Sequence, residues 1–176
     1  SSADADAVRQ AVRYLYDLGH RQIARVGGPE SLAHSYIRDS AFADVASELG
    51  MRYRCLHTDY TPETGREATK RLLAFSEHPT AIIYDNDVMA LAGLGVAASQ
   101  GIKVPEEISI MSWDDSLMCT AAYPNLTAMG RDVVDTGKQA AGLLLKLIGG
   151  ERVGHLMEGP YELRARASTG PAPAAE

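Results

Sequence analysis

The sequence predicts an α/β fold, a doubly wound parallel sheet with helices on both faces. Stretches with apolar residues at helical spacing alternate with short, continuously apolar stretches along most of the 176 residues. The ends of the expected strands recur at intervals of about 30 residues, which is the length of one strand–helix unit. They fall near Val26, Thr58, Tyr84 and Ser112. This alternation implies parallel strands buried between two helical layers.

Eight elements in chain order form the repeating part of this pattern. They are a helix over 5–18, a strand over 23–26, a helix from 31 or 32 to 49, a strand over 53–58, a helix from 62, a strand over 80–84, a helix over 88–100 and a strand over 108–113. The third helix has the clearest start, because Thr61 is a capping residue, Pro62 suits the first helical position and Glu63 puts a negative charge in the first turn. Strand 80–84 is apolar on both faces, as a central parallel strand should be.

The pattern changes after Asp115. A loop through Pro124 leads to a short extended piece over 126–129, and a long helix is expected over 132–148. Gly149-Gly150 stops that helix, and residues 161–167 return as a last strand. Residues 1–170 therefore form one folded unit, followed by a tail over 171–176 that we expect to be disordered.

Composition narrows the class of protein. Hydrophobic residues make up 45% and charged residues 23% of the chain, which is typical of a soluble globular protein. The net charge is −6 and no cluster of Lys and Arg stands out, so this segment has no basic patch that would bind DNA. Cys55 and Cys119 lie far apart, which favours reduced thiols and a cytoplasmic protein. No apolar run could span a membrane, and the first six residues lack the features of a signal peptide.

Polar and aromatic residues follow the strands. In an open parallel sheet, ligands bind at the carboxyl ends of the strands. The residues expected at that edge are Gly27-Gly28-Pro29, Asp59-Tyr60, Asp85-Asn86-Asp87 and Trp113-Asp114-Asp115. Carboxylates and amides can hydrogen-bond hydroxyl groups, and an aromatic ring can cover the apolar face of a sugar or a base. The sequence therefore predicts a pocket for a small polar ligand.

Each of these residues also has an ordinary structural interpretation. Asp87 can simply cap the helix that follows, Asp115 can begin the next turn, and Tyr60 can be a strand-end residue. Catalysis is not favoured, because the acidic pairs have no neighbouring His and Ser112 lacks the glycine-flanked turn of a nucleophilic serine. The five histidines are scattered without metal-ligand spacing, and Gly27-Gly28 is too short for a phosphate-binding loop. We predict no catalytic residue, no metal and no cofactor.

Motifs that cover almost the whole chain resemble one known family. In order, they are LGHRQIA (18–24) with GGP (27–29), RDSAF (38–42), PTAI (79–82) with NDVMA (86–90), VPEEISI (104–110) with SWDD (112–115), PNLT (124–127) and LRARAST (163–169). They are similar to the signatures of the lactose/purine repressor family of transcription regulators. Departures include Ala41 and Ser112 in place of the usual glycines, Trp113 in place of Phe or Tyr, and the added carboxylate of Asp85. These departures leave the identity of the ligand open.

The resemblance implies the effector-binding domain of such a regulator, a periplasmic-binding-protein-like lobe. The chain would be mainly the C-terminal lobe, with helix 132–148 belonging to the crossover and the N-terminal lobe. A helix-turn-helix domain that binds DNA would precede it. By motif, the residues implied to bind the ligand are Arg38, Tyr60, Asn86 and Asp114, with Asp85, Trp113 and Arg131 as second-tier candidates.

The resemblance also implies partners. Family members work as dimers, and a symmetric interface would use Leu91, Met118, Ala122 and Tyr123. The effector would be a sugar, a polyol or a nucleobase-like molecule, and no membrane is involved. Two alternatives remain: an exported sugar-binding protein, which shares the fold and would need a secretion signal, and a flavodoxin-like enzyme, which would show turnover or a bound cofactor.

Overall fold

The computed structural model describes residues 3–155 and 159–174 and has six helices and six strands within them. The helices are α1 (Ala3–Asp17), α2 (Ala33–Glu48), α3 (Pro62–Leu73), α4 (Asp87–Ser99), α5 (Leu117–Ala121) and α6 (Val133–Ile148). The strands are β1 (Gln22–Gly27), β2 (Arg52–His57), β3 (Ala81–Tyr84), β4 (Ser109–Trp113), β5 (Thr127–Gly130) and β6 (Glu162–Arg164).

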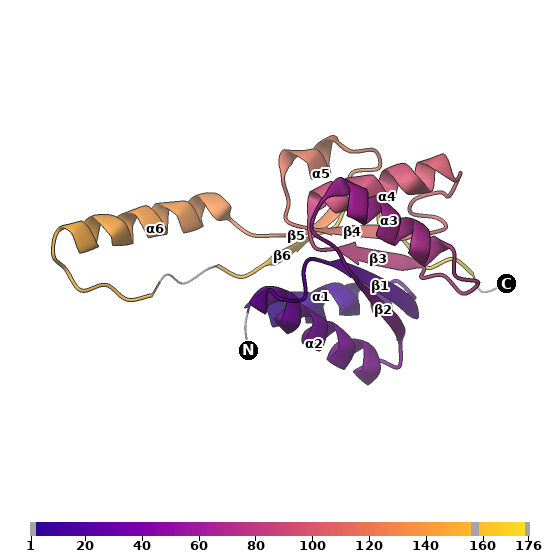
Figure 1. Ribbon diagram of the computed structural model, residues 1–176, viewed down its shortest axis with the longest axis horizontal. Helices are drawn as coiled ribbons and strands as arrows, with labels where there is room; N and C mark the ends of the chain where they lie inside the picture. Colours follow the sequence, from indigo (N-terminus) through magenta and orange to yellow (C-terminus); the bar gives the residue numbers. More distant parts are fainter. Residues whose placement is uncertain (1–2, 156–158, 175–176) are drawn as a thin grey trace.

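The six strands form one sheet in the order β2-β1-β3-β4-β5-β6 (Figure 1). The neighbours from β2 to β5 are parallel, and β6 pairs antiparallel with β5. The order reverses between β1 and β3, so the chain winds in both directions from the centre of the sheet. The predicted doubly wound α/β fold is confirmed, with an antiparallel edge strand added.

Helices cover both faces of the sheet (Figure 1). Helices α1 and α2 pack on one face, where Leu15 and Phe42 join Ile23 and Trp113 in a buried cluster. Helices α3 and α4 pack on the other face, in a second cluster that includes Tyr84 of the central strand. Two apolar layers therefore fix the sheet and the direction of its carboxyl edge.

The caps show how the sequence sets the helix starts. Thr61 caps α3 by accepting a hydrogen bond from the Thr64 backbone N–H at 3.3 Å, as predicted. For α4, the cap is Asn86 rather than Asp87: the Asn86 Oδ1 accepts from the Met89 N–H at 2.8 Å. Asn and Asp are similarly good caps, so adjacent candidates cannot be separated by residue type alone.

The last part of the chain returns to the body of the fold. The Ile110 N–H donates to the Ser168 carbonyl at 2.8 Å, and the Ala172 N–H donates to the Leu18 carbonyl at 2.8 Å. This differs from the expected disordered tail over 171–176, because Ala172 is tied to the end of α1. Residues 175–176 lie outside the described residues.

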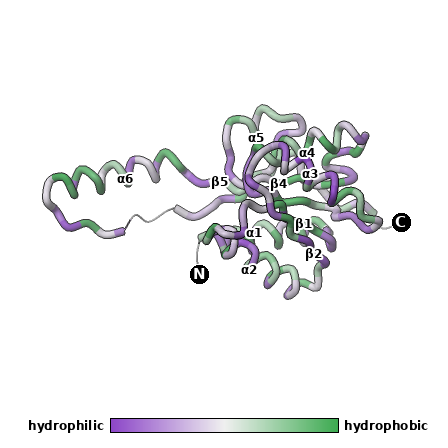
Figure 2. The backbone as a smooth tube through the Cα atoms, viewed as in Figure 1, coloured by the Kyte–Doolittle hydropathy of each residue, from purple (hydrophilic) through white to green (hydrophobic). Residues whose placement is uncertain are grey.

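Helix α6 projects away from the sheet (Figure 1). All of α6 is described, and none of its side chains is buried. Its large apolar side chains are exposed, among them Val133, Val134, Leu144, Leu145, Leu147 and Ile148. Figure 2 shows this run of apolar residues outside the body of the fold. Among the described residues, no helix is long and apolar enough to cross a membrane.

Candidate functional site

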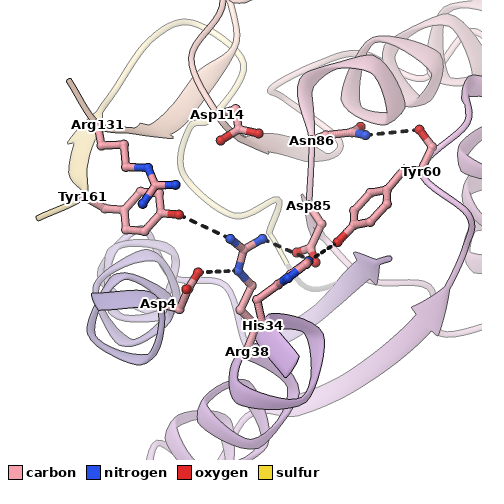
Figure 3. A pocket seen from close by; sticks show the side chains of 9 residues that line it. All are labelled: Asp4, His34, Arg38, Tyr60, Asp85, Asn86, Asp114, Arg131 and Tyr161. Atoms are coloured by element: carbon pink, nitrogen blue, oxygen red, sulfur yellow. Dashed lines mark hydrogen bonds and ion pairs between the residues drawn. The ribbon is translucent and has the colours of Figure 1, made fainter. Parts of the chain in front are cut away.

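A cleft of about 500 Å³ opens at the carboxyl edge of the sheet (Figure 3). Its lining comes from almost every unit of the fold: Asp4 on α1, His34 and Arg38 on α2, Tyr60 after β2, Asp85 and Asn86 after β3, Asp114 after β4, Arg131 after β5, and Tyr161 before β6. The structure thus brings together the four main candidates from the sequence, Arg38, Tyr60, Asn86 and Asp114.

Arg38 is held in place by protein groups on several sides. Its Nε donates to the Asp4 carboxylate at 2.7 Å, and its Nη2 donates to the Tyr161 hydroxyl at 3.3 Å. Its Nη1 lies 3.6 Å from an Asp85 oxygen. Burial would lower the pKa of Arg38, but the negative charges of Asp85 and Asp4 outweigh that effect and the pKa is raised. Arg38 is therefore a permanently charged and rigid donor.

Asp85 lies at the bottom of the cleft, where Arg25 binds it. Arg25 is 1% exposed, and its Nε donates to one Asp85 oxygen at 2.9 Å while its Nη2 donates to the other. Arg25 also pairs with Asp39. Asp85 is thus one member of a buried ion-pair network, and its carboxylate is already engaged on both oxygens.

Tyr60 and Asn86 form the side of the cleft opposite Tyr161 (Figure 3). The Tyr60 hydroxyl is hydrogen-bonded to His34 Nε2 at 2.6 Å, and the Tyr60 carbonyl accepts from Asn86 Nδ2 at 3.1 Å. A Cβ atom on Gly28 would come within 1.9 Å of the Tyr60 ring, so only glycine at this position lets the ring lie over the turn after β1. Asn86 joins two loops and caps α4, which leaves part of its amide for a ligand.

The Asp114 carboxylate points toward the cleft (Figure 3). The residue is exposed, and within the described residues its side chain makes no hydrogen bond or ion pair. Partial desolvation by the walls of the cleft raises the pKa of Asp114, and the charge of Arg38 acts in the opposite direction. The carboxylate can accept hydrogen bonds from ligand hydroxyl or N–H groups.

The second-tier candidates lie in different environments. Trp113 is 1% exposed and does not line the cleft; its ring lies beneath Arg38, 4.5 Å from the guanidinium carbon, and 5.3 Å from the Tyr161 ring. Arg131 lines the cleft, with its guanidinium 5.1 Å from the centre of the Tyr161 ring. Asp115, left open by the sequence, is bound by Arg164 and Arg166 at 2.7 Å each and does not line the cleft.

Sequence reasoning missed three lining residues, Asp4, His34 and Tyr161. His34 lies four residues before Arg38 on the same helix, and residues at that spacing share a face, so helical periodicity could have found it. Asp4 and Tyr161 come from segments whose place next to the cleft follows from tertiary packing. In the described part of the chain, no group of three or more His, Cys, Asp or Glu side chains is arranged to hold a metal ion.

The residues proposed for dimer contacts lie outside the cleft. Leu91 is half-buried on α4, and Met118, Ala122 and Tyr123 lie on or after α5, a helix that the sequence did not predict. Tyr123 is 97% exposed and Met118 is 42% exposed. This segment presents apolar side chains to solvent.

The doubly wound sheet and its polar cleft define a ligand-binding lobe. Residues 12–169 match the family of periplasmic binding protein-like domains. The chain belongs to this family. Over 169 residues it is 34% identical to the HTH-type transcriptional repressor CytR of Escherichia coli, covering 93% of this chain and 49% of the relative.

Two further proteins are similar to this chain. Catabolite control protein A of Priestia megaterium is 32% identical over 169 residues, which cover 93% of this chain and 51% of that protein. The crystal structure of a LacI family transcriptional regulator from Bifidobacterium animalis is 61% identical, with a TM-score of 0.91 over 96% of this chain and 62% of that one. The chain therefore spans about half the length of these curated relatives.

Proposed function

We propose that this chain is the effector-binding part of a DNA-binding transcription regulator, and that the cleft holds a small polar effector such as a sugar, a polyol or a nucleobase-like molecule. The observation that carries this proposal is the convergence of Arg38, Tyr60, Asn86 and Asp114 from separate loops on one solvent-accessible cleft. Polar groups that converge in a concave site are typical of small-molecule binding.

In the proposed complex, each residue has a distinct role. Arg38 donates to ligand oxygens, the unpartnered carboxylate of Asp114 accepts from ligand hydroxyl or N–H groups, and Asn86 adds a further polar contact. The Tyr60 ring covers an apolar face of the ligand, and Arg131 faces the cleft from the side of β5. Trp113 supports Arg38 from below.

The proposed regulator also has a second lobe, and the exposed apolar surface of α6 is evidence for it. Helix α6 exposes an apolar surface that no described residue covers. We propose that α6 packs against an N-terminal lobe, and that the effector binds between the two lobes. An effector with different affinities for two arrangements of the lobes shifts the population between a state that binds DNA and a released state. We place the protein in the cytoplasm as a homodimer, with the α5 segment in its interface.

The relatives support a regulator rather than an exported sugar-binding protein, because they are named as transcriptional repressors and regulators. The test is a thermal-shift screen of sugars, polyols and nucleobases on the intact protein, followed by calorimetry. We expect compounds of one of these classes to raise the melting temperature of the protein and to alter its operator affinity in a gel-shift assay. Stabilisation without any effect on DNA binding would remove the regulatory part of the proposal.

A further inference from the structure

We infer that Asp4 is a specificity-determining residue that makes the cleft select an uncharged ligand by neutralising Arg38. This inference rests on the proposed effector-binding function of the cleft. Asp4 comes from α1, whereas Arg38 comes from α2, so the pair joins two helices at the wall of the cleft.

Arg38 has more hydrogen-bond donors than its protein partners use. A guanidinium has five N–H donors in a fixed plane. The Nε donates to Asp4 at 2.7 Å, one Nη2 hydrogen is directed to Tyr161, and Asp85 lies 3.6 Å from Nη1. Asp4 therefore compensates the charge of Arg38 from one side, and Asp85, which is shared with Arg25, does so from the other. Unused N–H groups of Arg38 remain for a ligand oxygen.

Asp85 is held in a fixed position by Arg25. Arg25 engages both of its oxygens, and Arg25 in turn pairs with Asp39. Negative and positive side chains thus alternate in space, in the order Asp39, Arg25, Asp85, Arg38 and Asp4. In this row, Asp85 acts as a positioning residue for Arg38 and is not free to bind a ligand itself.

The charges around the cleft affect which ligands it can bind. Among the described residues that line the cleft or form the ion pairs of Arg25 behind it, Asp4, Asp39, Asp85 and Asp114 outnumber Arg25, Arg38 and Arg131. A phosphate or carboxylate would meet an arginine that is already compensated and would be repelled by the unpartnered Asp114 carboxylate. A hydroxyl group suffers neither penalty, since it can accept from Arg38 and donate to Asp114. The arrangement favours a neutral polyhydroxy ligand over a phosphorylated or acidic one.

The test uses inorganic phosphate as an anionic probe and the variant Asp4→Asn in the intact protein. Asn keeps the size of the side chain and removes its charge. We expect no saturable phosphate binding by the wild type in calorimetry at low salt. We expect Asp4→Asn to bind phosphate about tenfold more tightly or better, because one compensating charge next to Arg38 is lost. Arg38→Gln in the Asp4→Asn background should remove the gained binding, which would locate it in the cleft.

Asp6→Asn is the matched control, since it makes the same charge change on the same helix at a residue that does not line the cleft. Asp4→Ser is a second variant in case Asp4→Asn folds poorly. Phosphate binding by the wild type as tight as by Asp4→Asn, or an equal gain in Asp6→Asn, would overturn the inference. The proposed function fails separately, if no neutral compound in the screen binds the wild type while the phosphate result is as expected.

Discussion

At the scale of single residues, the backbone at the cleft is unusual. Tyr60 and Asp114 have φ values of 69° and 64°, in the left-handed region that few residues other than glycine adopt. This conformation costs about 1 kcal/mol for a residue with a Cβ atom, although Asp tolerates it better than most. Both residues follow strands and lie where the chain turns toward the cleft. Strained backbone of this kind concentrates at binding sites, where it aims a side chain at the ligand.

The conformation of Asp114 decides how its role should be tested. Asn tolerates the left-handed region, so Asp114→Asn should keep the melting temperature near that of the wild type while removing the charge. Loss of a hydrogen bond to a charged group, worth about 1.5–3 kcal/mol, should weaken effector binding about tenfold or more in calorimetry. Asp114→Ala should lose affinity too, but it should also lose about 1 kcal/mol of stability because of the positive φ. Wild-type affinity in Asp114→Asn would exclude Asp114 from the binding site.

A second prediction concerns pH and His20. His20 is fully buried, and it contacts Thr80 Oγ1 at 2.8 Å, Ser109 Oγ at 3.1 Å and the Gly170 carbonyl at 3.2 Å. Burial lowers the pKa of His20, Arg21 lowers it further, and the bond to Gly170 only partly opposes the shift. Below the ordinary pKa of 6.5, the unfolded chain takes up a proton that the folded chain resists. The contribution of His20 to stability is therefore complete above about pH 6.5 and is lost as the pH falls further.

The measurement is the free energy of unfolding by urea from about pH 7.5 to about pH 5, a range in which an unperturbed His titrates. We expect the wild type to lose stability with a steeper slope than His20→Gln, which keeps hydrogen-bonding groups but cannot take up the proton. Acidic residues affect both proteins alike, so the difference between the two curves reports on His20. Parallel curves would contradict the assigned shift.

At the scale of elements, the sequence predicted the order and type of the strands and helices because apolar periodicity is a local property. Helix α5 was missed, since five residues are too few to show a helical period, although Ser116 is a typical cap for it. The direction of β6 was also beyond the sequence, because a short edge strand of Glu162–Arg164 carries no signal for parallel or antiparallel pairing. The direction of β6 depends on its pairing with β5, which the local sequence does not encode.

Helix α6 gives the prediction at this scale. Leu145 is 69% exposed and belongs to neither core cluster of the described residues, so Leu145→Ser should leave the melting temperature of the 176-residue chain unchanged. In the intact protein, the same change should cost about 1.5–3 kcal/mol, because a leucine buried against the other lobe would be lost. Lys138→Ser on the same helix is the control, and it should be neutral in both proteins. If Leu145→Ser does not destabilise the intact protein, α6 does not make the proposed contact with the other lobe.

At the scale of the whole molecule, the cleft was predictable where it depends on topology and unpredictable where it depends on packing. The carboxyl ends of parallel strands share an edge, which is why Tyr60, Asn86 and Asp114 could be placed together from the sequence. Arg38 entered through the motif alone, since a helical arginine usually faces solvent. The partners that hold it are Asp4 on α1 and Tyr161 just before β6, which are far apart in the sequence and meet only in the folded chain.

The final prediction separates the lobe from the intact regulator. This chain carries a net charge of −6 and no basic cluster, so it should show no salt-dependent binding to DNA. The intact regulator should bind its operator, and saturating effector should change that affinity by at least about tenfold, which needs only about 1.4 kcal/mol of coupling between the two sites. Because coupling is reciprocal, operator DNA should change effector affinity by the same factor. Gel shifts at several salt concentrations and calorimetry with and without operator measure both sides. If the 176-residue chain alone gave a sequence-specific gel shift, the lobe itself would contact DNA. That result would contradict the proposal that a separate domain binds the operator.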